Sequence, residues 1–200
     1  STLNNTTSWY LQWLDDKTIF ASSNDITAFR SIDGGKTWQF PKYIGRRFNA
    51  TYKTAYDAQN GILYAAMSDA HDLYFGLKMA DGNIDGLNGE IDYSTDKGAS
   101  WKPLRAFNYE SQGKRLANPV LSVALDPKVP HRMYALVGNH SNGGVYRTDD
   151  LDKGEQATWT KMANPPRTEG HPWHIEILND GTLVVTYAGR VDEKGKMTES

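Results

Sequence analysis

The chain has 200 residues, a formal net charge of −2 and no cysteine. The near-neutral charge gives no reason to expect nucleic acid or a membrane surface as a partner, and the missing cysteines exclude disulfides and thiolate metal sites. No apolar run reaches the roughly 18 residues of a membrane span, and no secretory leader is expected in this segment. Six Trp, eleven Tyr and eighteen Gly, without long apolar helical patterns, favour an all-β protein with many turns.

Taken in chain order, the sequence predicts three strands, a tight turn and a fourth strand, and then repeats that order. The first unit has strand patterns at 8–14, 19–21 and 27–30, followed by the turn SIDGGKTW at 31–38. The next two units have strands at 51–58, 63–65, 90–93, 119–127, 133–135 and 144–147, with turns STDKGASW (94–101) and RTDDLDKGEQATW (147–159). A fourth unit begins with strands at 173–178 and 182–189 before the residues become polar. Spacings of roughly 60 residues indicate a repeat architecture.

Four antiparallel strands per unit predict the blades of a β-propeller. The expected organisation is one partial propeller domain over residues 1–200. Its boundaries are blade 1 at about 8–43, blade 2 at about 50–107 with an insertion at 69–89, blade 3 at about 119–163, and an incomplete blade 4 from 172. Propellers close with about four to eight blades. We therefore expect the remainder to come from sequence outside this chain or from another chain.

The turns share the pattern S-x-D-x-G-x-[ST]-W, which resembles the Asp box, or BNR repeat. This repeat occurs in sialidases, xyloglucanase-type glycoside hydrolases, Vps10/sortilin receptors and a photosystem assembly factor. Two copies match closely and the third is degenerate. The resemblance implies that the box residues are structural, with aspartates accepting bonds inside the turn and tryptophans anchoring it. These residues are Asp33, Trp38, Asp96, Trp101, Asp149 and Trp159.

The resemblance also implies that ligands meet the opposite face, which the B–C loops and the connections between blades build. Arginine and histidine gather in these segments, and arginine suits the carboxylate of an acidic sugar. The candidate substrate-binding residues are Arg46, Arg47, Tyr74, Arg115, His140, Arg167 and His171. The alternative is that these side chains are the ordinary polar residues of solvated loops.

Candidate acid–base residues on the same face are Asp25, Asp69, Asp72 and His71. The stretch FASSNDITAFR resembles a xyloglucanase-type stretch whose aspartate is catalytic, although two glycines of that stretch are missing here. Hydrolysis needs paired carboxylates. The expected function is a secreted glycoside hydrolase, extracellular or periplasmic, that acts on an oligo- or polysaccharide. Two alternatives stay open: a non-catalytic propeller that binds a glycan or a protein, and a polysaccharide lyase using His71 with Tyr74 or His140 with Tyr43.

No cofactor is required by this chemistry, but the insertion contains a calcium-like spacing. DGNIDGLNGEID, residues 81–92, places oxygen-bearing side chains at Asp81, Asn83, Asp85 and Asp92. This matches D-x-N-x-D-G with an acid at the twelfth position, the order of a calcium loop. An ordinary Asn/Asp/Gly turn is the alternative.

Overall fold

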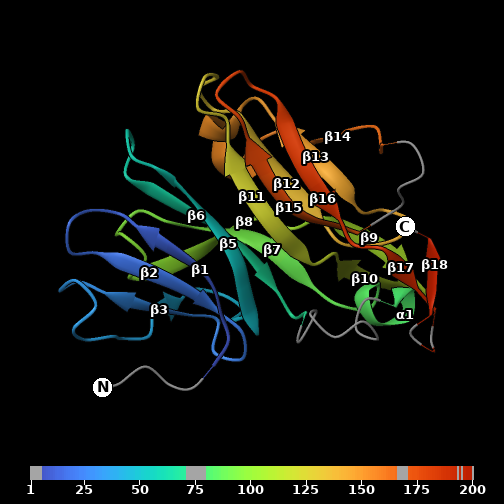
Figure 1. Cartoon of the computed structure of the whole chain (residues 1–200), viewed down its shortest axis with the longest axis horizontal. Coiled ribbons are helices and arrows are strands. Elements are labelled where there is room, and N and C mark those ends of the chain that lie inside the picture. Colours follow the sequence, from blue (N-terminus) through green and yellow to red (C-terminus); the bar gives the residue numbers. More distant parts are fainter. Residues whose placement is uncertain (1–5, 71–79, 166–170, 193, 195, 200) are drawn as a thin grey trace.

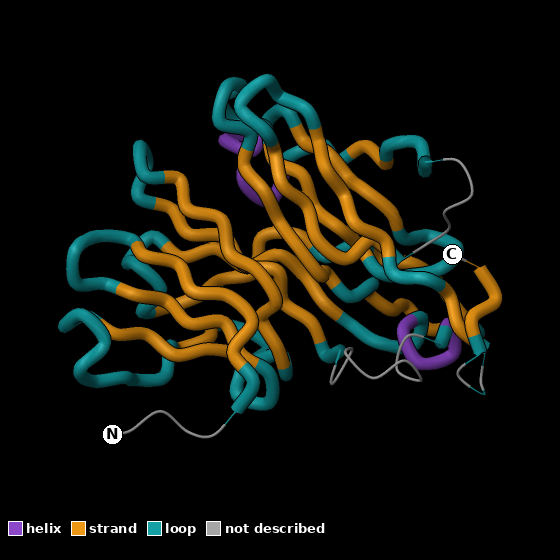
Figure 2. Tube along the Cα trace, viewed as in Figure 1, coloured by secondary structure: helices purple, strands orange, loops and turns teal. Residues whose placement is uncertain are grey.

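The protein is all-β and consists of several small antiparallel sheets that stand side by side (Figures 1 and 2). The computed structural model describes residues 6–70, 80–165, 171–192, 194 and 196–199. The successive sheets follow the chain from the N-terminal to the C-terminal part, which is the arrangement of propeller blades.

The first sheet has the order β1-β2-β3 and corresponds to predicted blade 1. Its strands are β1 (Ser8–Trp13), β2 (Ile19–Ser23) and β3 (Ala28–Ser31). The expected fourth strand of this blade is reduced to one bridge between Arg30 and Gln39.

The second sheet has the order β4-β8-β7-β6-β5. Its strands are β4 (Lys42–Tyr43), β5 (Ala50–Asp57), β6 (Ile62–Ser68), β7 (Gly89–Ser94) and β8 (Ser100–Arg105). The short β4 pairs in parallel with β8, through Lys42 opposite Ser100 and Tyr43 opposite Trp101. Residues 42–43, which the sequence assigned to blade 1, therefore extend the sheet of blade 2 and tie the two blades together by backbone hydrogen bonds.

The third sheet has all four predicted strands, in the order β11-β12-β13-β14, and the fourth pairs β15 with β16. These strands are β11 (Val120–Leu125), β12 (Met133–Val137), β13 (Gly144–Thr148), β14 (Thr160–Lys161), β15 (Pro172–Ile177) and β16 (Leu183–Tyr187).

Two segments expected to be loops form hairpins, and two others form short helices. The hairpins are β9 (Asn108–Ser111) with β10 (Lys114–Ala117), and β17 (Arg190–Val191) with β18 (Met197–Glu199). Helix α1 (Asp81–Ile84) lies in the blade 2 insertion, and the 3₁₀ helix η2 (Leu151–Gln156) lies in the third box.

Apolar side chains fill the spaces between successive sheets. Phe20 of the first sheet packs with Leu63 and Trp101 of the second. Ile91 and Met133 belong to the core between the second and third sheets. Tyr134, Leu136 and Ile175 join the third sheet to the fourth. The stacking of sheet faces is thus the main source of burial.

The first two boxes form the turn that the motif predicts. The Thr37 amide donates to Asp33 Oδ1 at 2.9 Å and its hydroxyl donates to Oδ2 at 2.6 Å. Ser100 repeats both bonds to Asp96, at 2.8 and 2.6 Å. The bonds from Thr37 lower the pKa of Asp33 to about 2. Both aspartates are therefore ionised turn acceptors at neutral pH.

In the third box the prediction of Asp149 as the turn acceptor is wrong, because Asp150 occupies that position. The Thr158 amide donates to Asp150 Oδ1 at 2.8 Å, and the Thr148 hydroxyl donates to the same oxygen at 2.8 Å. Asp149 instead forms ion pairs with Arg132 and Arg147. The spacing [ST]-x-D, shared by all three boxes, identifies Asp150. The extra residues between Asp150 and Thr158 form η2.

The three box tryptophans differ in burial. Trp101 is fully buried, with its ring centroid 5.0 Å from that of Phe20. Gly98 has a φ of +79°, and a Cβ there would lie 2.7 Å from the Phe20 ring, so this turn accepts only glycine without strain. Trp159 meets Phe107 edge-on at 5.4 Å, whereas Trp38 is only half-buried and donates to the Gly35 carbonyl at 3.0 Å.

Replacing Trp101 by alanine should lower the free energy of unfolding by about 3–5 kcal/mol, because it empties a closed core position. Trp38→Ala is the matched control and should cost about 1 kcal/mol, since that ring keeps contact with water. Urea unfolding followed by circular dichroism measures both. Equal losses for the two variants would contradict the assignment of Trp101 as the anchor between the first two sheets.

Asp150→Ala should lower the melting temperature by roughly 2–4 °C, the shift of a moderate local loss in a chain of this size. Asp149→Ala should change it by less than about 1 °C, because exposed ion pairs contribute little. Differential scanning calorimetry of the two neighbouring variants provides the comparison. A larger loss for Asp149→Ala would restore the original alignment of the third box.

Candidate functional site

The face that carries the B–C loops is closed near the ends of the inner strands by an apolar cluster. Ala80 bridges Val191, and Ile84 of α1 packs with Leu121 of β11. Figure 1 shows α1 beside β17 and β18. Trp9, Tyr52 and Trp173, from three different sheets, have ring centroids 5.2 to 6.0 Å apart. Residues 80–84 of the blade 2 insertion and Val191 of β17 therefore cover this end of the inner strands.

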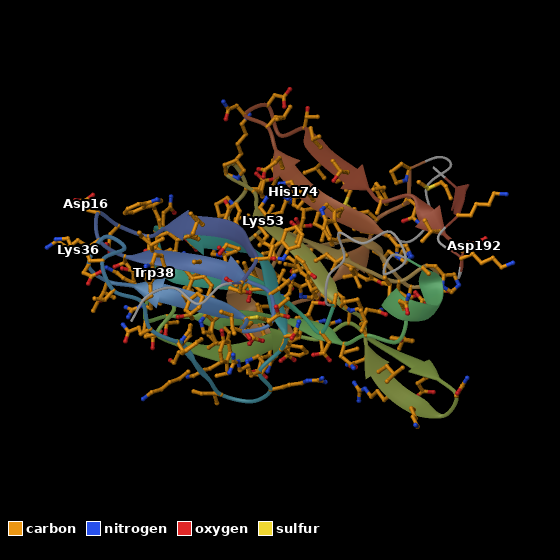
Figure 3. All side chains as sticks on the ribbon, turned by 60° about the horizontal axis from the view of Figure 1, so that its bottom comes forward. Asp16, Lys36, Trp38, Lys53, His174 and Asp192 are labelled. Carbon is orange, nitrogen blue, oxygen red and sulfur yellow. The ribbon has the colours of Figure 1, made fainter. Side chains whose placement is uncertain are left out.

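Beside this cluster, a buried lysine joins β5 to β15. Lys53 is 5% exposed, and its Nζ donates to the Ile175 carbonyl at 2.6 Å and to Glu176 Oε1 at 2.6 Å. His174 Nε2 lies 2.8 Å from the same Glu176 oxygen, and Lys53 and His174 lie next to each other in Figure 3. Sequence reasoning missed this group, because a single lysine within a strand carries no motif. Its contacts give it a structural role, since they connect the second and fourth sheets.

Between the first two sheets lies a charged group, the blade 1–2 cluster, made of Tyr43, Arg46, Arg47, Asp69, Glu90 and Asp92. Arg46 forms an ion pair with Asp69 and places its guanidinium 4.9 Å from the centroid of the Phe48 ring. Asp69 follows β6, and its amide donates to the Asn88 carbonyl at 2.7 Å, which closes the base of the insertion.

Arg47 is held on the blade 1 side of this cluster. Its Nη2 donates to the Ile26 carbonyl at 3.0 Å and its Nε to the Thr27 hydroxyl at 3.3 Å. The structure thus brings Arg46, Arg47 and Asp69 of the predicted site together.

Glu90 and Asp92 form a carboxyl pair on one face of β7, because residues two apart in a strand point the same way. Asp92 is 2% exposed. Burial, and then the charge of Glu90, raise the pKa of Asp92 to about 8. Burial also raises the pKa of Glu90, while Asp92 and Arg46 oppose that rise. Asp92 therefore carries a proton at neutral pH.

Two further observations mark Asp92 as an unusual buried group. Its Oδ1 is buried and has no hydrogen-bond partner among the described residues, which is uncommon for a polar atom in a protein interior. Tyr43 faces the same region, where burial raises the pKa of its hydroxyl and Arg47 opposes the rise. Sequence reasoning had considered Asp92 only as a calcium ligand and missed Glu90. Two acids with the spacing E-x-D on a predicted strand were the available signal.

The other predicted residues that the structure describes are spread over different elements. Asp25 is exposed in the B–C turn of blade 1, with a φ of 64°. Arg115 is exposed on β10, and His171 is fully buried just before β15. His71, Asp72, Tyr74 and Arg167 lie outside the described residues.

Two of the four predicted calcium ligands, Asp85 and Asp92, lie beside other side chains of the protein. Asp85 accepts a bond from the His140 amide at 3.0 Å and contacts the His140 ring, while the Tyr109 hydroxyl donates to its carbonyl. Asp92 lies in β7 beside Glu90 instead. In the described part of the chain, no three His, Asp or Glu side chains are placed to hold a metal ion. The side chain of Asp81 lies outside the described part of the chain, and calcium binding by this loop stays a prediction.

The contact between His140 and Asp85 also bears on the predicted lyase pair. His140 belongs to the loop before β13 and is bound to the blade 2 insertion, whereas Tyr43 is part of the blade 1–2 cluster. The two residues therefore have different partners, and their pairing as base and acid stays a prediction.

Comparison with known proteins supports the fold. No family model matches the sequence, and no curated protein does. A GH74 xyloglucanase from Xanthomonas campestris matches 73% of this chain with 16% identity and a TM-score of 0.50. An ancestral GH74 enzyme matches 88% with 12% identity and a TM-score of 0.55. The structure titled YCF48 bound to D1 peptide matches 92% with 14% identity and a TM-score of 0.51.

These similarities establish a propeller-like fold and nothing finer, because the identities are low. The chain spans 19% and 21% of the two GH74 chains and 49% of YCF48. Among the described residues, no helix is long and apolar enough to cross a membrane.

The carboxyl pair makes stability depend on pH in a defined direction. Because the pKa of Asp92 is about 8 in the folded chain and near 3.9 in the unfolded chain, the folded state binds the additional proton between these values. Its contribution to the free energy of unfolding is complete below about pH 4 and is lost as the pH rises through about 8. Stability should therefore fall between pH 5 and 8, and Asp92→Asn should flatten that fall.

Urea titrations at four pH values would measure this dependence, with Asp16→Asn in an exposed turn as the control. The control should keep the dependence of the unaltered chain. An Asp92→Asn variant with an unchanged pH slope would show that Asp92 is ionised in the folded state.

Proposed function

We propose that the chain is part of a carbohydrate-active β-propeller of the glycoside hydrolase type, with the Glu90–Asp92 pair at its acid–base centre. The observation that supports this proposal most is that Asp92, within β7, is a buried carboxyl whose pKa is raised to about 8. A glycoside hydrolase needs a carboxylic acid that stays protonated near neutral pH, so that it can protonate the leaving oxygen.

The two carboxyls would have different parts in this chemistry. Glu90 is half-buried and Asp92 nearly inaccessible, so Glu90 is the group that a sugar could reach. Asp92 would keep its own proton beside Glu90, and Glu90 would regain a proton from the water that completes the hydrolysis. Burial raises the pKa of Glu90, and the charge of Arg46 opposes this rise. With Arg47 close by, the surroundings would favour a glycan that carries carboxylates.

Further blades, supplied by additional sequence or by another chain, would complete this propeller. The outer strands carry large apolar side chains on exposed faces: Leu11 and Trp13 of β1 are 58% and 55% exposed, and Val184 of β16 is 46% exposed. Faces of this kind are covered by the neighbouring blade in a closed propeller. A second carboxylate for hydrolysis could come from there. A secreted, extracellular or periplasmic location belongs to the same proposal.

A second candidate function is a non-catalytic propeller that binds a glycan or a protein. Two observations favour it. The predicted carboxylate Asp69 is paired with Arg46, and Asp85 is paired with His140. The apolar cluster around Trp9, Tyr52 and Trp173 also closes the end of the inner strands. Paired charges and a closed centre suit a docking surface better than a catalytic cleft.

Glu90→Gln in the natural protein that carries this chain should lower the release of reducing ends from polysaccharide by about 10²- to 10⁴-fold, the usual contribution of general acid catalysis. Glu110→Gln, an exposed acid on β9, is the matched control and should keep full activity. Xyloglucan and polygalacturonate serve as neutral and acidic substrates, and affinity electrophoresis measures binding separately.

The outcomes separate the two candidate functions. Turnover that is lost only in Glu90→Gln supports hydrolysis. Retention of a polysaccharide by the unaltered protein without turnover would replace hydrolysis by the binding function. Full activity of Glu90→Gln would remove this pair from the mechanism.

A further inference from the structure

A cavity of about 690 Å³ lies between the second and third sheets, at the end of their strands that is opposite to the apolar cluster around Trp9, Tyr52 and Trp173. It opens among the turn before β6, the segment before β12 and the third box. Figure 2 shows η2 at the upper edge of the molecule and α1 at the lower right, and η2 forms one wall of this cavity. Its volume falls within the roughly 300–1,000 Å³ typical of small-molecule sites. No part of the function proposed above uses it.

One wall of the cavity is formed by paired residues of β5, β6 and β7 in the second sheet. Tyr64 of β6 lies directly opposite Tyr93 of β7, and Ile62 lies opposite Asp57 of β5. Residues 62 and 64 share one face of the strand, so the patch presents two phenol rings and an aliphatic side chain. Burial, and then the Asp57 charge, raise the pKa of Tyr64 to about 12, which keeps its hydroxyl a neutral hydrogen-bond donor.

The facing wall of the cavity is formed by η2, a segment that the first two boxes lack. In the first two boxes the aspartate accepts the amide of the fourth residue after it, whereas Asp150 accepts the amide of Thr158, eight residues on. The Thr158 amide therefore closes the turn across the intervening segment, and Lys153 of that segment donates to Asp150 Oδ2 at 3.0 Å. All six residues of η2 line the cavity. The extra segment thus converts a plain turn into one side of a pocket.

The charges around the cavity are predominantly negative. Asp152 and Glu155 are exposed at its rim, and Asp57 contributes a third carboxylate. Of the two basic residues in its lining, Lys153 is directed to Asp150 at 3.0 Å, and His131 Nδ1 lies 3.9 Å from Asp152 Oδ1. The rim therefore keeps an excess of negative charge over an aromatic and aliphatic floor.

We propose that this cavity binds an organic cation, an ammonium or guanidinium group carried on an apolar or aromatic stem. The stem would pack against Ile62, Tyr64 and Tyr93, and the cation would meet the Asp152 and Glu155 carboxylates. Aromatic faces add to this attraction, because ring quadrupoles favour cations. A neutral sugar would gain less from the acidic rim, and an anion would be repelled by it.

The test uses a cation and its neutral counterpart, 2-phenylethylammonium and 2-phenylethanol, with the full ¹⁵N-labelled chain. Chemical shift changes in NMR spectra should map to residues of the cavity for the cation, with a dissociation constant on the order of 1 mM, as for small fragments. The alcohol should bind at least about tenfold more weakly, since it lacks the charge that the rim attracts. Raising the salt concentration should weaken only the cation.

The double variant Asp152→Asn/Glu155→Gln should weaken binding of the cation by about tenfold. Asp16→Asn/Glu110→Gln removes the same charge from exposed positions outside the cavity lining and should leave binding unchanged. Because all four positions are exposed, circular dichroism should show both variants folded. Equal binding of the alcohol, shifts mapping elsewhere, no binding of the cation, or equal losses in both double variants would each overturn the proposal. Hydrolase activity is not part of the readout, so the result does not depend on the Glu90–Asp92 assignment.

Discussion

The structure depends on the burial of both faces of its inner strands. Every residue of β2 and β12 is buried, as is most of β5 and β6. A strand of this kind needs packing on both faces, which neighbouring sheets supply for β5, β6 and β12. β1 and β16 instead alternate between more and less exposed residues, because only one of their faces meets another sheet. Stacking of sheets thus determines where the chain has a core and where it has accessible faces.

Much of this fold could be predicted from the sequence, because repetition compensates for the weakness of short strand signals. Three copies of the box placed the strands around Phe20, Tyr64 and Tyr134, each before a turn of recognisable chemistry. The failures occurred where the repeat gives no guide. The parallel pairing of β4 with β8 depends on a contact between blades, and the β9–β10 hairpin occupies a connection that varies from blade to blade. Asp149 was misassigned because the inserted segment obscured the [ST]-x-D spacing.

The candidate site was less predictable, because its chemistry comes from burial and not from residue type. Arg46, Arg47 and Asp69 were found by their position in connecting segments, and the structure brings them together. Glu90 has no motif, and it matters only because β7 places it beside Asp92 in a region with little water. The sequence around Asp92 suggested calcium ligands, yet strand pairing places it two residues from Glu90 on one face. The spacing alone did not indicate that residues 89–92 belong to β7.

Insertions at the two ends of the sheets have opposite effects on the exposed surface. At one end, the blade 2 insertion and the β17–β18 hairpin add Ile84 and Val191 to an apolar cluster, which reduces exposed surface. At the other end, η2 adds Asp152 and Glu155 beside the phenol rings of the second sheet, which creates concave, charged surface. The box turn permits the second kind of change because Thr148 and Thr158, which flank the inserted residues, both still bond to Asp150 Oδ1. A turn closed by its own aspartate can therefore accept new residues at little cost to the fold, which makes the box end of a blade a suitable place for a new binding site to arise.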